Sequence, residues 1–480
     1  MRAPEPGRPD PTEAPPEAEL PAELFTRTVE LLRELTAISS PSGDPAGLRR
    51  MAGRLAAAFA ERGLAAEVRE EPGEGGAPLP VVYATGAAGG AGGAGAGPAG
   101  AGAAGAGAAG AGGAGAAAAG AGAVEGNGSA GGSGGVRGAA ASAPPSPLLL
   151  VGHLDTVLAA SPPRLTGQAL FATGAVDMKG GLAALAGALD LLARRGLSPP
   201  ADLLLVVVPD EEVGGTLSRS LVERWGERAR ALWVLEPGEP AGEEAEGETL
   251  VAGRRGLFQW RLGVCGRAAH SGLHYWEGRS ALTAAAEWCL EAQRMCWRTD
   301  GPTVNCGRLV AGDQSFVGDL ARASDLLGTE RQLNVVPDRA LAEGEARFLR
   351  VSEGRRLEGR LEMLAAKIST ATGTELRFTA SRAIPPVDPH GPHRHRLERA
   401  AALAAARGWR LELEDERGGI SFPNFLPDPS RLPVLDGLGP AGGGLHTRDE
   451  FVDLRSLRRR IVLLADLLAE EAGGEDRAAG

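Results

Sequence analysis

The chain has 480 residues, of which 43% are hydrophobic, and a formal net charge of −11. This length exceeds that of one ordinary hydrophobic core, so we expect two or three domains. The acidic balance argues against nucleic acid or an anionic membrane surface as the main partner. No apolar run approaches the length that crosses a bilayer.

Residues 1–20 are rich in proline and glutamate and lack the apolar core of a secretory signal. We expect a disordered tail there, because such a segment buries too little apolar surface to offset its ordering entropy. The four cysteines form no CxxC pair: Cys265, Cys289, Cys296 and Cys306. They are typical of reduced thiols in a cytoplasmic protein.

Two amphipathic helices are expected next. Leu24, Leu31 and Leu35 recur at helical spacing. Asp44 followed by Pro45 is a typical N-cap and first-turn pair, and predicts the start of the second helix.

Residues 87–146 consist almost entirely of glycine and alanine. They lack the large apolar side chains that could form a core, so we expect a disordered loop insertion. The tract separates two strand-like runs, PVVYAT and PLLLVG. It therefore replaces a short surface connection, where added length costs little.

Fully apolar strands then alternate with helices. The runs Leu148–Val151, Leu203–Val208 and Leu232–Leu235 predict buried strands, and leucines from Leu182 to Leu192 form a helical stripe. Uninterrupted apolar strands between helices indicate a sheet covered on both faces, that is, an α/β domain.

From residue 256 to residue 382 the expected order changes to strand, helix, strand, strand, helix, strand. These elements are Leu257–Val264, Ala281–Trp297, Thr303–Val310, Leu341–Arg350, Leu357–Ile368 and Glu375–Ala380. This is the ferredoxin-like arrangement, which closes on itself as a small domain. The chain then returns to α/β character, so we expect this domain to be inserted between two parts of a large domain, residues 21–255 and 383–480.

Polar side chains follow the apolar strands where they end. His153 and Asp155 follow the first strand and, being two apart, share one face of an extended segment. Further candidates follow later strands or glycine-rich turns, namely Asp177, Asp210, Glu211, Glu212, Glu236 and His446. Because the carboxyl ends of strands in an open α/β sheet line the site crevice, these groups should converge.

Two histidines with several carboxylates and no cysteine suit zinc, or cobalt or manganese in its place. A carboxylate can bridge two metals, and another left unbound can act on the water between them. Each residue alone also has an ordinary explanation: Asp177 as a helix cap, Glu211 and Glu212 in a solvated turn, His446 in a flexible loop. Several such groups in this order favour a shared metal site.

The motifs GHLDTV, GAVDMKGG, DEEVGG, EPG and GGGLHTRDE occur in this order in the chain. In these, and in GRAAHSG and LNVVPDRA, it resembles the co-catalytic di-zinc aminoacylase/carboxypeptidase superfamily, which includes glutamate carboxypeptidase, acetylornithine deacetylase and succinyl-diaminopimelate desuccinylase. DEEVGGTLSRSLVE and SSPSGDPAGLRRMA look most similar to the glutamate carboxypeptidase branch. The resemblance covers nearly all of residues 21–469 outside the Gly/Ala tract.

That resemblance implies an α/β zinc-hydrolase domain with a mixed sheet covered by helices, and an inserted ferredoxin-like (βαββαβ) lid that also serves dimerisation. It also implies two zinc ions. His153 and Glu236 would hold one ion, Glu212 and His446 the other, and Asp177 would bridge them.

The resemblance implies two further groups that act without binding metal. Glu211 would be the general base, and then the general acid, in the hydrolysis of an amide. The residues agree with this division, because neighbouring Glu211 and Glu212 in an extended turn point in different directions. Asp155 would fix the imidazole tautomer of His153.

In the lid, the resemblance implies that His270 reaches the active site of the partner subunit and stabilises the oxyanion. Asn334 and Arg347 match positions that hold the free carboxylate of the substrate, a task that suits the planar fork of arginine. Taken alone, His270 and Arg347 each have an ordinary explanation as well, His270 as a histidine of a surface loop and Arg347 as a solvated strand residue.

The sequence departs from the family pattern at three positions. Glu345 stands where the family usually has aspartate, Phe422 where the Ser-Asp-x-Asn motif has its aspartate, and Gly215 where serine is common. None of these is an implied metal ligand, so the departures bear on the substrate pocket.

The leading hypothesis is a cytoplasmic, homodimeric di-zinc carboxypeptidase that releases a C-terminal, glutamate-like amino acid from a peptide or an N-acyl amino acid. An N-acyl amino acid deacylase of the acetylornithine deacetylase or desuccinylase type would share all catalytic residues and differ only in its pocket. A third hypothesis, an inactive peptide-binding member, is opposed by the intact ligands and base. Neither nucleic acid nor a membrane is expected as a partner.

Overall fold

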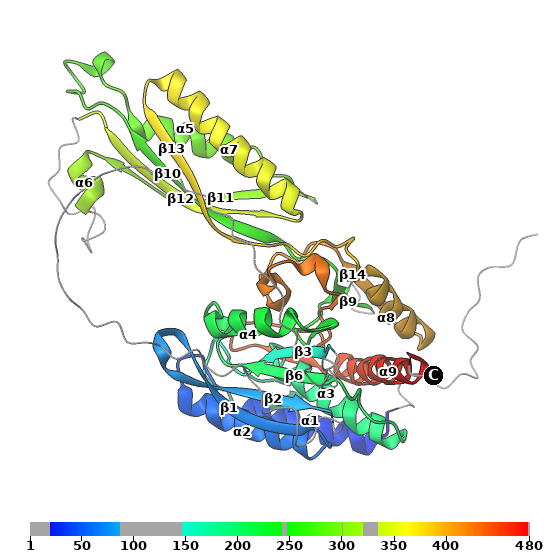
Figure 1. The fold of residues 1–480 in the computed structure, drawn as a ribbon. Coiled ribbons are helices and arrows are strands. Elements are labelled where there is room, and N and C mark those ends of the chain that lie inside the picture. The colour runs from blue at the N-terminus through cyan, green and yellow to red at the C-terminus, as the bar shows by residue number, and fades with distance from the viewer. Residues whose placement is uncertain (1–19, 87–145, 242–246, 300, 320–334, 479–480) are drawn as a thin grey trace, which may run out of the picture. The chain divides into compact units, whose positions relative to one another are not determined.

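The computed structural model describes residues 20–241, except 87–145, and residues 247–478, except 300 and 320–334 (Figure 1). The Gly/Ala tract, nearly all of the N-terminal tail, and Asn334 lie outside the described residues. Leu20 was expected in the tail, but its side chain is only 2% exposed and packs in the main core, and Arg458 hydrogen-bonds to its carbonyl oxygen. A single apolar side chain beside a polar segment can thus join the core, which a composition argument overlooks.

A six-stranded mixed sheet forms the centre of the large domain. Its strand order is β1 (Ala65–Pro72), β2 (Pro78–Thr85), β6 (Leu203–Val208), β3 (Leu148–His153), β7 (Ala231–Val234) and β15 (Val434–Leu435). The pairs from β6 to β15 are parallel, whereas β1 with β2 and β2 with β6 are antiparallel. The expected mixed sheet is therefore confirmed.

Helices cover this sheet on both faces, with α4 on one side and α1, α2 and α3 on the other (Figure 1). The helices of this part are α1 (Ala22–Ala37), α2 (Pro45–Ala60), α3 (Lys179–Arg194), α4 (Thr216–Gly226), α8 (Arg394–Ala406) and α9 (Leu454–Ala478). Every residue of β3 and β6 is buried, as expected for strands covered on both faces.

Local sequence signals explain how two of these helices begin and pack. Asp44 caps α2 by accepting hydrogen bonds from the backbone N–H groups of Ala46 and Gly47, at 3.1 and 3.0 Å. Gly181 lies where α3 crosses the end of β7, and a Cβ atom there would lie 2.0 Å from the carbonyl oxygen of Leu235. Gly181 therefore lets α3 approach the sheet closely.

Two smaller sheets complete this part of the molecule. One has the order β14 (Arg410–Glu414), β9 (Gly247–Val251) and β8 (Pro240–Ala241), and the other β16 (Gly442–Gly443), β17 (Phe451–Asp453), β5 (Ala169–Phe171) and β4 (Arg164–Thr166). None of these short strands was predicted from the sequence, because segments of two to five residues carry little periodicity.

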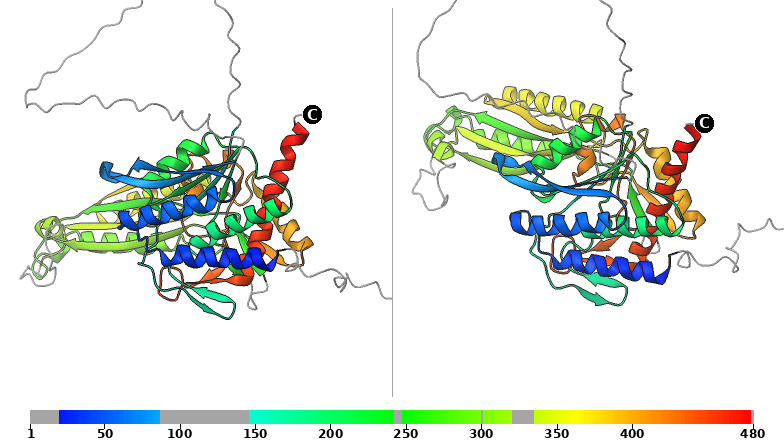
Figure 2. Two further views of the ribbon diagram at one scale, coloured as in Figure 1. Left: turned by 90° about the horizontal axis from the view of Figure 1, so that it is seen from below. Right: turned by 60° about the horizontal axis from the view of Figure 1, so that its bottom comes forward.

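The inserted segment forms an antiparallel four-stranded sheet with the order β11, β12, β10 and β13. In chain order its elements are β10 (Gly256–Cys265), α5 (Ala281–Gln293), β11 (Thr303–Gly312), α6 (Gln314–Asp319), β12 (Arg339–Phe348), α7 (Val351–Thr372) and β13 (Glu375–Ile384). Figure 2 shows α7 lying along one face of this sheet. The ferredoxin-like arrangement is confirmed, although α5 ends at Gln293, four residues earlier than expected, and α6 was not foreseen.

The two parts have separate hydrophobic cores. In β10, buried and more exposed residues alternate, which is typical of a sheet with one face under helices. We infer a catalytic domain and a lid with nearly the boundaries expected from the sequence; β13 continues two residues past residue 382.

The described residues on either side of the Gly/Ala tract lie close together. The backbone N–H of Gly86 donates to Leu203, and that of Leu148 donates to Asp202, so both ends meet the start of β6. Because β2 and β3 flank β6, a connection of about 10 Å would join them. This geometry supports the interpretation that the tract is inserted into a short connection.

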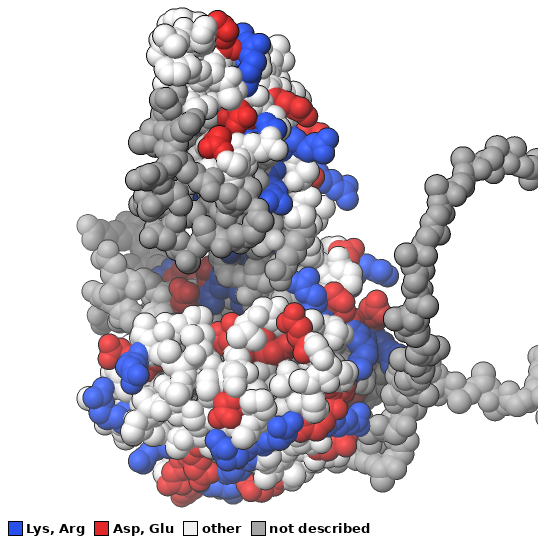
Figure 3. Space-filling model, turned by 90° about the vertical axis from the view of Figure 1, so that its left-hand side faces the viewer, with Lys and Arg blue, Asp and Glu red and all other residues white. Residues whose placement is uncertain are grey.

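The surface charge and the apolar length of the helices are relevant to nucleic acid and to a membrane as possible partners. On the face shown in Figure 3, basic and acidic side chains are interspersed. Among the described residues, no helix combines the length and the apolar character that crossing a membrane requires.

Candidate metal centre and active site

His153 is the last residue of β3, and its side chain is 1% exposed. Its Nδ1 lies 3.0 Å from the carbonyl oxygen of Asp155 and 3.3 Å from the Asp155 carboxylate. These acceptors hold the proton on Nδ1 and leave Nε2 directed at the other carboxylates. Nε2 lies 3.2 Å from Asp177 Oδ1 and 3.8 Å from Glu236 Oε1.

Asp177 lies between the two histidines of the site. Besides the contact to His153, its Oδ2 lies 3.3 Å from His446 Nε2. The alternative that Asp177 caps α3 is wrong, because the N-cap residue is Met178 and no side chain caps this helix. The Asp177–Met178 peptide bond is cis. Asp177 therefore has both carboxylate oxygens directed at histidines from different parts of the chain.

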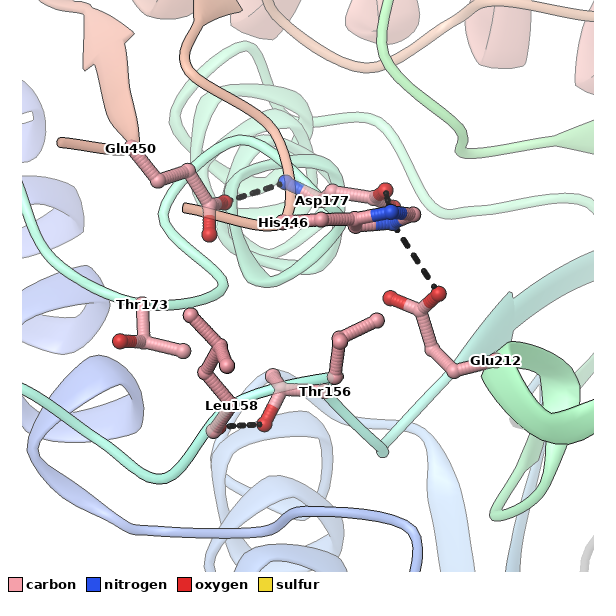
Figure 4. Close-up of a pocket in the computed structure, with 8 residues that line it drawn as sticks. Thr156, Leu158, Thr173, Asp177, Glu212, His446 and Glu450 are labelled. Atoms are coloured by element: carbon pink, nitrogen blue, oxygen red, sulfur yellow. Dashed lines mark hydrogen bonds and ion pairs between the residues drawn. The ribbon is translucent and has the colours of Figure 1, made fainter. Parts of the chain in front are cut away.

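Glu212 and His446 complete the second half of the site. Glu212 Oε2 lies 3.2 Å from His446 Nε2, and the close-up in Figure 4 shows this pair beside Asp177. The backbone of His446 has a φ of 61°, a left-handed conformation that non-glycine residues rarely adopt and that is found at functional sites. The imidazole is 52% exposed, so this side of the site is open to solvent.

An extended turn was predicted for Glu211 and Glu212, and this prediction is wrong. Residues Glu211–Val213 form a 3₁₀ turn after β6. The Asp155 carboxylate accepts the backbone N–H of Glu211 at 3.3 Å and that of Glu212 at 3.1 Å. Asp155 therefore orients His153 through its carbonyl oxygen and its carboxylate. The same carboxylate positions the Glu211–Glu212 turn by accepting two backbone N–H groups.

Burial and repulsion between like charges raise the pKa values of three carboxyl groups of the site. Burial raises the pKa of Glu211 and of Glu212 to about 7, and the negative charge of Asp177 adds to both shifts. Burial and then Asp177 also raise the pKa of Glu236 well above its usual range. The hydrogen bond to Asp177, together with Glu212, raises the pKa of His446 to about 9. The site thus holds more buried negative charge than its histidines neutralise, and a bound cation would offset this excess.

The donor atoms fit two divalent metal ions. One group is His153, Asp177 and Glu236, the other is Asp177, Glu212 and His446, and within each the candidate ligand atoms lie within 4.8 Å of one another. Imidazole and carboxylate donors without thiolate suit zinc and its neighbours in the first transition series. Asp177 belongs to both groups, as a bridging ligand would.

Several residues that the sequence analysis missed support this site. Glu450 accepts the backbone N–H groups of Gly174, Val176 and Asp177, at 2.7, 3.0 and 3.0 Å, and so holds the loop before α3. The Ser421 hydroxyl lies 3.4 Å from Glu236 Oε1. Glu450 lies four residues after His446 in GGGLHTRDE, and this closeness to a metal-ligand candidate was the only sequence signal for it.

A buried arginine also lies near the carboxylates. Arg254 is 4% exposed and donates to both oxygens of Asp436, at 2.5 and 3.1 Å. Against the opposing effect of burial, Asp436 chiefly raises the pKa of Arg254, and the charges of Glu236 and Glu211 add to this shift, so the positive charge of Arg254 acts on this region too. Sequence alone offered no signal that would have separated Arg254 from its neighbour Arg255.

A small pocket opens beside the second metal group (Figure 4). Its walls are Thr156, Val157, Leu158, Thr173, Asp177, Glu212, His446 and Glu450. The Thr156 and Thr173 hydroxyls donate to the backbone carbonyls of Leu158 and Ala159. The pocket is therefore lined by metal-ligand candidates on one part and by polar and apolar side chains on the rest.

The lid candidates are not part of this cluster. The Nδ1 atom of His270 accepts the backbone N–H groups of Gly272 and Leu273, at 3.1 and 3.2 Å, within its own loop. Arg347 donates to Glu345 at 2.8 Å and to the carbonyl oxygen of Gly418. Neither metal group includes these residues.

One of the departures from the family pattern, Phe422, lies close to the site. Phe422 is fully buried, with its ring centroid 6.4 Å from that of His153. Gly215 has a φ of 58°, and a Cβ atom there would approach Phe425 to 3.4 Å. Phe422 therefore packs behind a metal-ligand candidate and does not face the pocket of Figure 4.

Comparison with known proteins agrees with this geometry. The model of Peptidase family M20/M25/M40 matches residues 149–470. Carboxypeptidase G2 of Pseudomonas sp. (strain RS-16) is 25% identical over 334 residues, which cover 68% of this chain and 74% of that protein. Succinyl-diaminopimelate desuccinylase of Rhodospirillum centenum (strain ATCC 51521 / SW) is 27% identical over 314 residues, which cover 64% and 75%.

Solved structures share the fold. Aminopeptidase PepT from Bacillus cereus superposes with a TM-score of 0.65 at 17% identity, covering 94% of this chain and 99% of that chain. The M20 family metallo-carboxypeptidase Sso-CP2 from Sulfolobus solfataricus gives a TM-score of 0.54 at 14% identity, covering 93% and 99%. The family match spans more than half of the chain and includes every residue of the two metal groups, so this protein is a member of Peptidase family M20/M25/M40, an enzyme of the metallopeptidase and amidohydrolase type.

Proposed function

We propose that the chain is a di-zinc carboxypeptidase that releases a C-terminal, glutamate-like amino acid from a peptide or an N-acyl amino acid. The observation that carries this proposal is the pair of three-residue metal groups that share Asp177. His153 and Glu236 would hold one ion, Glu212 and His446 the other, and Asp177 would bridge them. Cobalt or manganese would suit the same donors.

When bound, the two ions would polarise the scissile carbonyl and make the attacking water more acidic. Glu211 takes the proton from this water and passes it to the leaving nitrogen. It is the carboxylate of the Glu211–Glu212 turn that belongs to neither metal group, so it is free to accept a proton from the water and to donate it to the leaving nitrogen. Asp155 acts as a positioning residue for His153 and for the turn.

The substrate side of the proposal rests on the lid. Arg347 presents a guanidinium that is only partly buried, and its present acceptors are a carboxylate and a backbone carbonyl. The free carboxylate of a leaving amino acid offers the same kind of acceptor to this planar fork. Asn334 is proposed to share this task. The similarity to carboxypeptidase G2 and to desuccinylases supports a substrate of this class.

A substrate series tests this assignment. With a fixed acyl group, N-acyl glutamate should be hydrolysed with a kcat/KM about 100-fold higher than that of its α-carboxamide. The reason is that a neutral amide cannot form the bidentate ion pair that a carboxylate forms with Arg347. In Arg347→Leu, this preference should shrink toward unity. The matched control is Arg350→Leu, a nearby exposed arginine, which should keep the preference.

The same series separates the competing functions. Selectivity for the leaving amino acid with tolerance of the acyl group supports the carboxypeptidase. Selectivity for acetyl or succinyl groups would instead favour a deacylase, and no turnover of any member with both metals bound would favour a peptide-binding protein.

We further propose a homodimer in which His270 completes the site of the partner subunit. Because Nδ1 of His270 accepts two backbone N–H groups, the neutral ring carries its proton on Nε2. Nε2 makes no hydrogen bond to any of the described residues, so this N–H is available to a developing oxyanion. The lid sheet also has two edge strands, β11 and β13, of the kind that pair between subunits.

Subunit mixing tests this arrangement. His270→Ala and Glu211→Gln should each be nearly inactive, but subunit exchange between them should restore activity, because one site of each mixed dimer then has both groups. Assay after exchange, with exchange verified by a tag on one variant, gives the measurement. If His270 serves its own subunit, every site lacks one group and activity stays low.

A further inference from the structure

The lid brings two cysteines together that lie 17 positions apart in the sequence. The Sγ atoms of Cys289 and Cys306 are 3.3 Å apart, within hydrogen-bonding distance for thiols. Cys289 lies on α5 and is half-buried, whereas Cys306 lies on the edge strand β11 and is exposed; both elements are labelled in Figure 1. A disulfide bond is about 2.05 Å long, so bond formation requires the sulfur atoms to approach by little more than 1 Å.

Strand geometry explains why Cys306 faces the helix. Val304 and Cys306 are two apart, so they lie on the same face of β11, and Val304 is 5% exposed in the core beneath α5. The residue paired with Cys306 on β12 is Gly344, which has no side chain to cover it. The pairing register then shifts between Cys306 and Arg308, a bulge that ends the regular alternation. Cys306 therefore reaches α5 and remains open to solvent.

The other two cysteines have different surroundings. Cys296 Sγ accepts the backbone N–H of Val304 at 3.0 Å. Cys265 is the last residue of β10, which is separated from β11 by β12. All four cysteines are within the described residues, and among them only Cys289 and Cys306 have their sulfur atoms in contact.

We propose that Cys289 and Cys306 are a thiol–disulfide site, which a low-molecular-weight disulfide such as oxidised glutathione converts to an intrachain disulfide that links α5 to β11. Cys306, as its thiolate, attacks one sulfur of oxidised glutathione; the S–S bond breaks and one glutathione leaves. Cys289 then attacks the Cys306 sulfur, releases the second glutathione and transfers its proton to it. Two protein thiols are oxidised and one glutathione disulfide is reduced to two glutathione molecules.

The exposure of the two sulfurs sets the order of these steps. The exposed Cys306 can meet the oxidant, whereas Cys289 is the resolving group. Burial raises the pKa of Cys289 to about 12, and hydrogen bonding and charge repulsion from Cys306 add to this shift. Once Cys306 is a neutral mixed disulfide, its charge no longer opposes ionisation of Cys289, whereas the effect of burial remains.

The disulfide bond would fix the edge strand β11 of the lid sheet to α5. It closes a loop that contains the end of α5 and Trp297, whose side chain is 71% exposed. A disulfide across a loop of about this length stabilises a domain by restricting the unfolded chain. We therefore expect the oxidised lid to unfold at a higher temperature than the reduced lid.

The experiment equilibrates the purified full chain in glutathione buffers of increasing oxidised fraction, followed by alkylation and peptide mass mapping. We expect one intrachain bond between Cys289 and Cys306, two remaining thiols (four cysteines minus the two in the bond), and a higher unfolding temperature that reductant reverses. Separate glutathione adducts on both cysteines, a bond between chains, or pairing with Cys265 or Cys296 would each overturn the proposal.

Two variants sharpen the test. Cys289→Ser should stop at a stable mixed disulfide on Cys306, since the resolving thiol is absent. The matched control, Cys265→Ser with Cys296→Ser, should form the intrachain bond as the wild type does. If Cys289→Ser gains no glutathione at Cys306, the proposed order of attack is wrong.

Discussion

Replacement of Glu211 by glutamine should lower kcat about 1,000-fold, within the range expected when a general base is lost. Glutamine keeps the size of the side chain but cannot accept the proton of the attacking water. Because Glu211 belongs to neither metal group, the variant should retain the metal content of the wild type. Steady-state kinetics and elemental analysis on the same preparation provide the two measurements.

The matched control for this experiment is Glu212→Gln, one residue further along the same 3₁₀ turn. Glu212 lies 3.2 Å from His446 and belongs to the second metal group, so this variant should lose activity together with metal. The contrast between the neighbours distinguishes a proton-transfer role from a ligand role. Near wild-type turnover in Glu211→Gln would show that another group is the base.

Removal of metal by a chelator should abolish hydrolysis and destabilise the fold. Without a cation, the carboxylates of Asp177, Glu212 and Glu236 are left close together with too little positive charge. Binding to the folded state alone contributes about 4 kcal/mol of stability for each ion at a thousand-fold excess over Kd. Activity and unfolding temperature should therefore both fall, and both should return when zinc is added.

The number of ions lost in each variant tests the bridging arrangement. After zinc loading and desalting, the wild type should hold about two equivalents. Asp177→Asn should bind neither ion tightly, whereas His446→Ala should keep about one, because only Asp177 belongs to both groups. His395→Ala, an exposed histidine on α8, should keep both. A wild-type content near zero would refute the two-metal proposal.

Much of the architecture could be predicted because the sequence carries strong, local signals. The apolar run Leu203–Val208 became β6 without change, and Asp44 caps α2 as its position indicated. The six lid elements also follow from periodicity, since each is long enough to show it. Short strands such as β8 and β16, with two residues each, form only because neighbouring strands supply their hydrogen-bond partners.

The sequence by itself determined which residues are available for the chemistry. Strand ends and glycine-rich turns marked His153, Asp177, Glu236 and His446, because parallel strands deliver the groups that follow them to one edge of a sheet. This signal depends only on local pattern and topology.

The tertiary structure alone decided how these groups meet and what supports them. Asp177 faces both histidines and does not cap α3, and Glu450 holds its loop from 273 residues away in the sequence. The contact between Cys289 and Cys306 likewise arises only when β11 packs under α5. Such contacts depend on side-chain direction and distance across elements, and a sequence pattern encodes neither until packing of the core brings those elements together.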